Sequence, residues 1–332
     1  HCPVLADGRL DLNAMRALLE QYSGKIKLVA VTGASNVTGW TNPVHDLAAL
    51  AHRHGARIFV DCAQLLPHRK VEKGRPGQAE YLDFIAFSGH KVYAPFGGGA
   101  LIGPRDFFNS TEPDIRGGGT IKVVTLDEVF WADSPDRDEA GSPNVIGAVA
   151  LAASLRQLAA VGMEAVAQHE AEMTSALLER LAGIPQVRVY GGADPRRVED
   201  RVGVVAFEIQ GIAHGKAAAI FGFEGGIGVR DGCFCAHPYV LNLLNITAEQ
   251  FEEHRNRAVA GDRIDLPGVM RASFGCYTNL EDLERLTVMI KRVIAGDYRG
   301  EYEVEGCTGS YYPKGIRLEE LTGCLPSSLC GN

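Results

Sequence analysis

Apolar and polar residues follow two different periods in the first sixty residues of the chain. After Asp11, leucine and methionine recur every three or four positions as far as Tyr22, which predicts an amphipathic helix that Gly24 ends. Short apolar runs at residues 28–32 and 57–60 are instead typical of buried strands. The chain therefore begins with helices and strands that alternate.

A second helix is predicted between these two runs. Asn42 and Pro43 suit its cap and its first turn, it continues through His54, and Gly55 ends it. Strand, helix and strand at this spacing form a right-handed unit in which the two strands are parallel. The first part of the chain is therefore expected to contain a mainly parallel sheet.

The stretch from Asp83 to Lys91 is the centre of the predicted site. Its apolar run, residues 84–87, ends abruptly in Ser88 and three further small, polar or basic residues. In an open parallel sheet, ligands bind beyond the carboxyl ends of the strands. Because the run at 57–60 leads into Asp61 in the same way, we expect a carboxylate and an amine at one edge of the sheet.

An acid and a lysine at one pocket suit pyridoxal 5'-phosphate (PLP). Its aldehyde condenses with a lysine amine, and its ring nitrogen needs an anion to stay protonated. Lys91 would be the amine and Asp61 the anion. A solvated lysine at a strand end is the structural alternative.

Four motifs then make the chain resemble class V, fold-type I PLP-dependent enzymes, in particular the cysteine desulfurase and selenocysteine lyase group. They occur in the order and approximate spacing of that family, from about residue 1 to about residue 296. The motifs are Ser35-Asn36-Val37-Thr38-Gly39, Asp61-Cys62-Ala63-Gln64, Ser88-Gly89-His90-Lys91 and Ala140-Gly141-Ser142-Pro143-Asn144. The resemblance implies an α/β fold, with a mainly parallel sheet flanked by helices and a smaller α+β carboxy-terminal domain.

The resemblance divides the chain into a partial PLP-binding large domain over residues 1–150 and a small carboxy-terminal domain over residues 151–296. A long helical region at 145–181, broken near Gly162, connects them, and strands are expected at 187–190, 203–208 and 269–274. Thr278 and Glu281 predict a capping box for a last helix that Gly296 closes. Residues 297–332 lack apolar periodicity and form a tail without an assigned role.

The family carries a Gly/Thr phosphate-binding turn and a ring-stacking aromatic or histidine earlier than any position present here. The resemblance therefore implies that this chain, which begins at His1, is a fragment or the larger part of an incomplete chain. A non-catalytic, truncated PLP-fold module is for this reason one of the functions to consider.

The resemblance assigns the cofactor contacts residue by residue. Lys91 binds PLP covalently and then moves the substrate α-proton, while Asp61 faces the ring nitrogen. The remaining contacts are Asn36 and Gln64 to the phenolic oxygen, Ser88 and His90 to the phosphate, and Ser142 to the phosphate of a second subunit. Asn36, Gln64, Ser88 and His90 each also suit an ordinary turn or helix entry. The assignment of Ser142 implies a homodimer with a shared active site.

An amino-acid substrate is implied by the arginine at position 271. By family analogy Arg271 grips the α-carboxylate with its two-pronged donor geometry. Arg230 is a second candidate, which alternatively pairs with Asp231 or Glu224. An ion-pair arginine in the small domain is the structural alternative for Arg271.

The segment Gly232-Cys233-Phe234-Cys235-Ala236-His237-Pro238 leaves more than one interpretation open. Cys235 stands where desulfurases carry the cysteine that attacks the substrate sulfur, and Arg230 or His237 would favour its thiolate. Cys233 departs from the pattern, since a histidine is common there. A buried structural thiol is the alternative, and zinc is disfavoured because a fourth ligand is missing.

Charge and composition limit the remaining functions. A net charge of −8 and the lack of a basic stripe argue against nucleic acid as a partner. No apolar run is long enough for a membrane span, and no signal-peptide pattern occurs. Eight cysteines in 332 residues are too few for a disulfide framework, which favours a reducing, cytoplasmic compartment.

The favoured function is thus a PLP-dependent lyase that removes sulfur or selenium from an amino acid through a persulfide on Cys235, with a sulfur-acceptor protein as a partner. The alternative within the same fold is a class V aminotransferase or epimerase, which would use Lys91 and Asp61 identically and would not need Cys235. The third hypothesis is the non-catalytic module.

Overall fold

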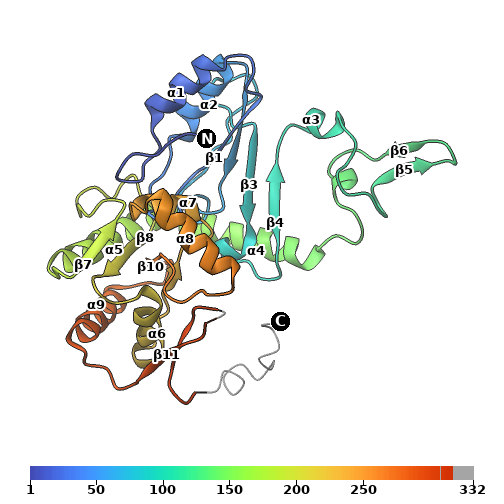
Figure 1. Cartoon of the computed structure of the whole chain (residues 1–332). Helices are drawn as coiled ribbons and strands as arrows, with labels where there is room; N and C mark the ends of the chain where they lie inside the picture. Colours follow the sequence, from blue (N-terminus) through green and yellow to red (C-terminus); the bar gives the residue numbers. More distant parts are fainter. Residues whose placement is uncertain (307, 317–332) are drawn as a thin grey trace. The chain divides into compact units, whose positions relative to one another are not determined.

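The computed structural model describes residues 1–306 and 308–316 (Figure 1). The chain forms two compact units. Unit 1 comprises His1–Pro3, Asp11–Ala34 and Thr41–Ala167, and unit 2 comprises Val4–Leu10, Ser35–Trp40 and the residues from Gln168 onward. The domain division expected after residue 150 stays a prediction; unit 1 itself runs to Ala167.

Unit 1 contains a four-stranded sheet in the order β1-β2-β3-β4, in which β1, β2 and β3 are parallel and β4 is antiparallel. A separate hairpin, β5 and β6, follows this sheet. The strands are β1 (Leu28–Thr32), β2 (Arg57–Asp61), β3 (Phe84–Ser88), β4 (Gly99–Ile102), β5 (Ile121–Val124) and β6 (Val129–Trp131). The helices are α1 (Leu12–Gln21), α2 (Val44–Arg53), η1 (Gly89–Val92), α3 (Arg105–Asn109), η2 (Asp136–Asp138) and α4 (Val145–Val161).

The first helices form where the apolar periodicity predicts them, with one difference at a cap. Asp11 caps α1 by accepting hydrogen bonds from the backbone N–H groups of Asn13 and Ala14. The predicted cap of α2 at Asn42 is wrong, because the helix begins at Val44 and Pro43 occupies the cap position. The Asn42 amide instead donates to the carbonyl of Thr32 at the end of β1, so it fastens the loop to the sheet.

Unit 2 is built on an antiparallel sheet in the order β7-β8-β10-β9. Its strands are β7 (Val187–Tyr190), β8 (Val204–Ile209), β9 (Arg230–Gly232) and β10 (Val269–Ser273). The helices are α5 (Met163–Ala182), which belongs to unit 2 from Gln168 onward, α6 (His214–Gly225), α7 (His237–Leu243), α8 (Ala248–Val259) and α9 (Leu280–Ala295). Gly162, with a φ of 91°, separates α4 from α5 as predicted.

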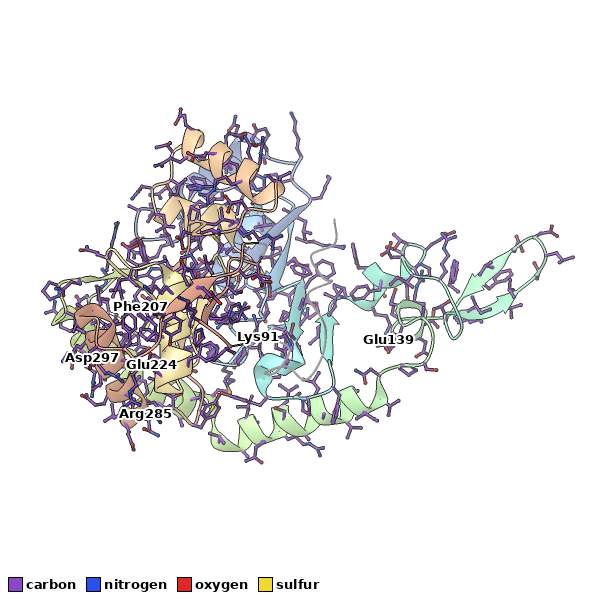
Figure 2. All side chains as sticks on the ribbon, turned by 60° about the horizontal axis from the view of Figure 1, so that its bottom comes forward. Lys91, Glu139, Phe207, Glu224, Arg285 and Asp297 are labelled. Carbon is purple, nitrogen blue, oxygen red and sulfur yellow. The ribbon has the colours of Figure 1, made fainter. Side chains whose placement is uncertain are left out.

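Alternation along β8 and β10 gives this sheet two apolar faces. Phe207 of β8 and Met270 of β10 point into a core formed with α5, α6 and α9. The neighbours Ala206 and Val269 point to the other face, where they pack with Phe234 and α7. Phe207, labelled in Figure 2, is fully buried. Arg271 follows Val269 by two residues in β10, so its side chain lies on the face of the sheet that packs with Phe234.

The last helix differs from its prediction at the cap. The predicted capping box of Thr278 and Glu281 is wrong, because Asn279 caps α9 and its reciprocal partner is Asp282. The Thr278 hydroxyl instead accepts from the backbone N–H of Gly275. Gly296 closes the helix in the left-handed conformation, as predicted.

Part of the tail that follows has regular structure, although it lacks apolar periodicity. Strands β11 (Tyr302–Val304) and β12 (Tyr311–Pro313) form an antiparallel hairpin. Tyr302 packs against the core of unit 2, and β12 contacts α6. The cysteines at positions 307, 324 and 330 lie outside the described residues.

Candidate functional site

Five of the predicted site residues lie at one edge of the sheet in unit 1. Asp61 is the last residue of β2 and pairs in register with Ala86 of β3. Because β2 and β3 are parallel, the residues that follow both strands emerge at the same edge. Ser88 ends β3, and the short η1 turn after it carries His90 and Lys91, the latter labelled in Figure 2.

The functional groups of three of these residues have defined contacts. The Lys91 amine donates to Oε1 of Gln64 at 3.4 Å. The Gln64 amide nitrogen lies 3.2 Å from Nε2 of His68, one helical turn further along. Oδ1 of Asp61 accepts from the backbone N–H of Ala63 at 2.8 Å. An amine, an amide and a carboxylate therefore stand at the end of neighbouring strands.

The turn that carries Lys91 is held by close packing of the backbone. The Gly89 N–H donates to the Gly98 carbonyl at 2.7 Å, and a Cβ at Gly89 would lie only 2.6 Å from that oxygen. Val92, which ends the turn, is fully buried against α4, and the Ser154 hydroxyl donates to its carbonyl. Only glycine at position 89 allows this arrangement.

Cys62 lies beside this group but is unsuited to nucleophilic chemistry. Its side chain is fully buried, and burial together with the neighbouring Asp61 carboxylate raises the pKa of its thiol to about 12. A thiol with that pKa stays protonated at neutral pH. We therefore interpret Cys62 as part of the core.

Ser142 lies elsewhere in unit 1, exposed in the turn before α4. The cap of this helix is Asn144, which accepts from the Gly147 N–H and donates to the carbonyl of Phe96. The hydroxyl of Ser142 is thus not needed for the cap. Its contact with the phosphate of a second subunit stays a prediction.

The remaining predicted residues belong to unit 2, where Arg271 has the most contacts. Its Nη1 donates to the backbone carbonyl of Asn36 at 2.8 Å, and its Nε donates to the Ser273 hydroxyl at 3.1 Å. Arg230 of β9 lies opposite it in register. Burial and the charge of Arg230 lower the pKa of Arg271. A half-buried guanidinium beside a second cation is well suited to bind a carboxylate.

Asn36 has a second contact that the sequence did not predict. Its side-chain amide donates to the backbone carbonyl of Phe234 at 2.8 Å, across 198 positions in the chain. The Arg271 guanidinium lies 5.0 Å from the centre of the Phe234 ring. Asn36, Phe234 and Arg271 therefore contact one another in a closed triangle. The predicted contact of Asn36 with the cofactor stays a prediction.

The two cysteines of the 233–235 loop have different environments. Cys235 is exposed, whereas Cys233 is half-buried and its thiol donates to the Pro267 carbonyl. Burial raises the pKa of Cys233 to about 11, so this thiol stays protonated. Phe234 and Cys235 both have positive φ angles, 52° and 60°, which L-residues rarely adopt. Consecutive residues in this conformation are typical of functional loops.

The alternative pairings predicted for Arg230 are wrong. Asp231 lies 3.1 Å from Nδ1 of His214, and Glu224 accepts from the backbone N–H groups of Arg299 and Gly300. Both carboxylates are thus engaged by other groups, and the exposed Arg230 faces Arg271 across the register. Among the described residues, no group of three or more His, Cys, Asp or Glu side chains is arranged to hold a metal ion.

Sequence reasoning missed His68 and Phe234 as site residues. The spacing of Gln64 and His68, four positions on a helical turn, was a signal for the first. For Phe234, the signal was its position between Cys233 and Cys235. An aromatic side chain there is able to anchor the loop in the core while the thiol of Cys235 stays exposed.

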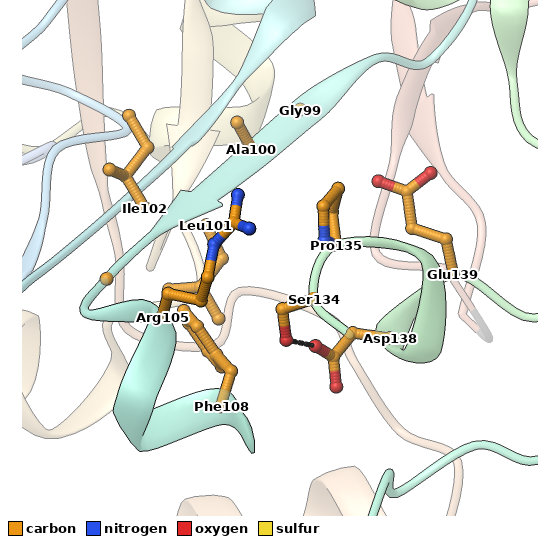
Figure 3. A pocket seen from close by; sticks show the side chains of 11 residues that line it. Gly99, Ala100, Leu101, Ile102, Arg105, Phe108, Ser134, Pro135, Asp138 and Glu139 are labelled. Carbon is orange, nitrogen blue, oxygen red and sulfur yellow. Dashed lines mark hydrogen bonds between the residues drawn. The ribbon is translucent and has the colours of Figure 1, made fainter. Parts of the chain in front are cut away.

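Two of the cavities in the described part of the chain have a polar lining. One of about 440 Å³ lies in unit 1 between β4 and residues 134–139, and its polar lining includes Arg105, Asp138 and Glu139 (Figure 3). The other, of about 980 Å³, lies in unit 2 among α6, α7, α8 and the turn of the β11–β12 hairpin. Cys233 and His237 of the segment around Cys235 line the second cavity, whereas none of the predicted cofactor or substrate contacts lines either one.

Among the described helices, none is long and apolar enough by itself to cross a membrane. The bent pair α4 and α5 reaches the required length and composition only when taken together, with an angle of 75° between the two helices.

Comparison with known proteins agrees with the geometry. Residues 1–286 match the family profile described as aminotransferase class-V. A cysteine desulfurase of Dickeya dadantii (strain 3937) is 35% identical over 292 residues, which are 88% of this chain and 62% of that protein. A probable cysteine desulfurase 2 of Mycobacterium leprae (strain TN) is also 35% identical, with the same coverage. The chain thus spans less than two thirds of the length of these relatives.

A solved structure has the same fold. The apo structure of a cysteine desulfurase from Thermococcus onnurineus NA1 superimposes with a TM-score of 0.75 at 32% identity, and the match covers 89% of this chain and 66% of that one. The predicted α/β fold of type I, with its mainly parallel sheet and flanking helices, is confirmed.

Proposed function

Because the chain belongs to the aminotransferase class-V family, we propose that the protein uses PLP to remove sulfur or selenium from an amino acid. The observation that carries this proposal is the exposed Cys235 thiol on a loop with two left-handed residues, anchored to Arg271 through Phe234. The curated relatives named as cysteine desulfurases support it.

The chemistry of the groups in unit 1 fits the cofactor. PLP carries an aldehyde, a ring nitrogen that must stay protonated and a phenolic oxygen, which match the Lys91 amine, the Asp61 carboxylate and the Gln64 amide. Ser88 and His90 on the following turn, with Ser142 from a second subunit, would hold the phosphate. Asn36 would contact the phenolic oxygen. When bound, PLP stabilises negative charge at the substrate α-carbon.

Asp61 and Lys91 would perform the proton chemistry. The Asp61 carboxylate keeps the proton on the ring nitrogen; two opposite charges about 4 Å apart at an effective dielectric constant of about 20 attract by roughly 4 kcal/mol. The Lys91 amine, once the substrate amine has replaced it, accepts the proton from the α-carbon. Gln64 keeps that amine oriented through its Oε1 atom.

Arg271 and Cys235 would act on the substrate itself. The half-buried Arg271 guanidinium binds the α-carboxylate, with Arg230 adding positive charge. The Cys235 thiolate attacks the side-chain sulfur or selenium, so that a bond between the two chalcogens forms and the bond to the β-carbon breaks. The electron pair of the broken bond stays with the carbon skeleton. A persulfide, or its selenium counterpart, remains on Cys235.

Two partners belong to this proposal. One is a second copy of the chain, since Ser142 would complete the phosphate contacts of the other subunit. The other is a sulfur-acceptor protein, which would take the sulfur from the exposed Cys235.

The Cys235→Ala variant separates this function from the aminotransferase or epimerase alternative. The full-length protein with PLP should release sulfide from L-cysteine and absorb at about 420 nm. The variant should keep the absorbance and lose sulfide release, whereas unchanged turnover of another amino acid would favour the alternative. Absence of the absorbance band would support the non-catalytic module. The Cys276→Ala variant, which removes another exposed thiol, should behave as the wild type.

A further inference from the structure

We propose that Phe234 is a positioning residue that holds the Cys235 loop in a resting conformation until a carboxylate binds to Arg271. The inference rests on the proposed function and adds to it the link between substrate recognition and thiol release. Phe234 stands directly before the thiol in the chain, and its ring lies under the guanidinium that would bind the substrate.

The loop needs an external hold because its backbone is strained. Phe234 and Cys235 both occupy the left-handed region, where a side chain meets the following carbonyl oxygen. Such residues persist only when their surroundings fix them. Cys235 is exposed, so the hold acts on Phe234, which is 6% exposed and packs with Val240 and Val269.

Two specific contacts supply this hold from different parts of unit 2. The Asn36 side chain donates to the carbonyl of Phe234, and the Arg271 guanidinium lies 5.0 Å from the ring centre. Arg271 also donates from Nη1 to the Asn36 carbonyl, so each residue of the triangle is tied to both others. The attraction between ring and guanidinium depends on the positive charge of the guanidinium.

Arg271 can bind a carboxylate while the triangle is in place. A guanidinium has five N–H groups, of which Nε uses one on Ser273 and Nη1 uses one on Asn36. Three N–H groups, one on Nη1 and two on Nη2, have no acceptor among the described residues. These three N–H groups are enough to bind both oxygens of a carboxylate that approaches the end of the guanidinium formed by Nη1 and Nη2.

A bound carboxylate would weaken the hold on the loop. Its negative charge offsets the charge of the guanidinium and so reduces the attraction for the Phe234 ring. The strained backbone of Phe234 and Cys235 is then able to relax, and the thiol becomes mobile when the substrate has arrived.

Alkylation of Cys235 tests this link without relying on turnover. The full-length protein with PLP is treated with iodoacetamide, and the rate at Cys235 is measured by peptide mass spectrometry with and without L-alanine, a carboxylate ligand that has no sulfur. We expect L-alanine to raise the wild-type rate about fivefold. Cys276, exposed on another turn of unit 2, is the internal reference and should not respond.

Phe234→Leu keeps an apolar side chain and removes the ring face. Its Cys235 should be alkylated about fivefold faster without any ligand, and L-alanine should add nothing further. Asn36→Ala should change the rate in the same direction, whereas Phe234→Tyr, which keeps the ring, should respond as the wild type does. Circular dichroism and the cofactor absorbance check that each variant is folded and loaded.

The inference is overturned if Phe234→Leu has the wild-type rate without ligand, or if the wild type does not respond to L-alanine. If the protein still releases sulfide in either case, the positioning role of Phe234 is contradicted but the proposed function is not. Conversely, a protein that shows the carboxylate response and releases no sulfide would support the link and contradict the proposed reaction.

Discussion

The amine of Lys91 donates to the side-chain oxygen of Gln64 at 3.4 Å, although the two residues are 27 positions apart and follow different strands. The parallel pairing of β2 and β3 explains this contact, because it brings the residues after both strands to one edge. Asp61, three residues before Gln64, emerges at the same edge. The proposed PLP site requires this arrangement of Lys91, Gln64 and Asp61 at one edge of the sheet.

Loss of the Asp61 carboxylate should abolish most of the activity. Asp61→Asn keeps the size of the side chain and removes the charge, so about 4 kcal/mol of attraction for the protonated ring is lost, which corresponds to roughly a thousandfold fall in kcat. Steady-state rates of sulfide release give the change in kcat. The exposed Asp127→Asn is the matched control. A variant within about tenfold of the wild type would show that Asp61 does not face the ring.

Arg271→Lys should weaken substrate binding more than it slows the reaction. Lysine keeps the charge and loses the two-pronged geometry, so we expect KM to rise about tenfold to a hundredfold. Initial rates over a range of L-cysteine concentrations separate KM from kcat. Arg196→Lys, at an exposed position, should have no effect. An unchanged KM would contradict the role of Arg271 in binding the carboxylate.

A side chain at position 89 should destabilise unit 1. Gly89→Ala would put a Cβ 2.6 Å from the Gly98 carbonyl, and crowding of this kind costs about 1–3 kcal/mol. Urea denaturation of the full-length protein gives the change in the free energy of unfolding. At Gly118 a Cβ meets nothing within 4 Å, so Gly118→Ala is the control. Equal stability of the two variants would mean that the Lys91 turn is not tightly packed.

His214 should make stability depend on pH. Burial by itself would lower its pKa, but hydrogen bonds to the Asp231 carboxylate and the Leu266 carbonyl outweigh burial and raise the pKa above its usual value. Both ring nitrogens face acceptors, and only the protonated ring can donate to both. The stabilisation is therefore fully present below about pH 6.5, the ordinary histidine pKa, and is lost as pH rises through the raised pKa of the folded state.

Denaturation of wild type and His214→Asn at several pH values checks this expectation. The variant should be less stable by about 1–3 kcal/mol at low pH, because the charge-assisted hydrogen bonds of the protonated ring to Asp231 and Leu266 are lost, and the difference should shrink as the pH rises. A difference that grows with pH would contradict a charged His214.

Much of the fold was predictable because it depends on local signals. The run at residues 28–32 is β1 to the residue, and Gly162 separates α4 from α5 where the helical pattern breaks. The predicted cap of α9 lies one residue too early because Thr278 with Glu281 and Asn279 with Asp282 both fit the capping pattern. Only the path of the preceding turn, which engages Thr278 with Gly275, decides between them.

Other features depend on contacts that no local pattern encodes. Strands β5, β6, β11 and β12 are three or four residues long, too short to show a clear alternation of apolar and polar residues. The contact of Asn36 with Phe234 spans 198 positions and depends on which face of unit 2 each residue occupies. The residue types of the site were therefore predictable from motifs, whereas the triangle around Arg271 was not.

The most direct test of the account is the site of covalent attachment of the cofactor. The full-length protein is incubated with PLP, reduced with sodium borohydride, digested and analysed by mass spectrometry. We predict a reduced pyridoxyl group on Lys91, which is lost in Lys91→Ala and retained in the control Lys122→Ala. A protein that carries no such group, or carries it on a different lysine, would contradict the account.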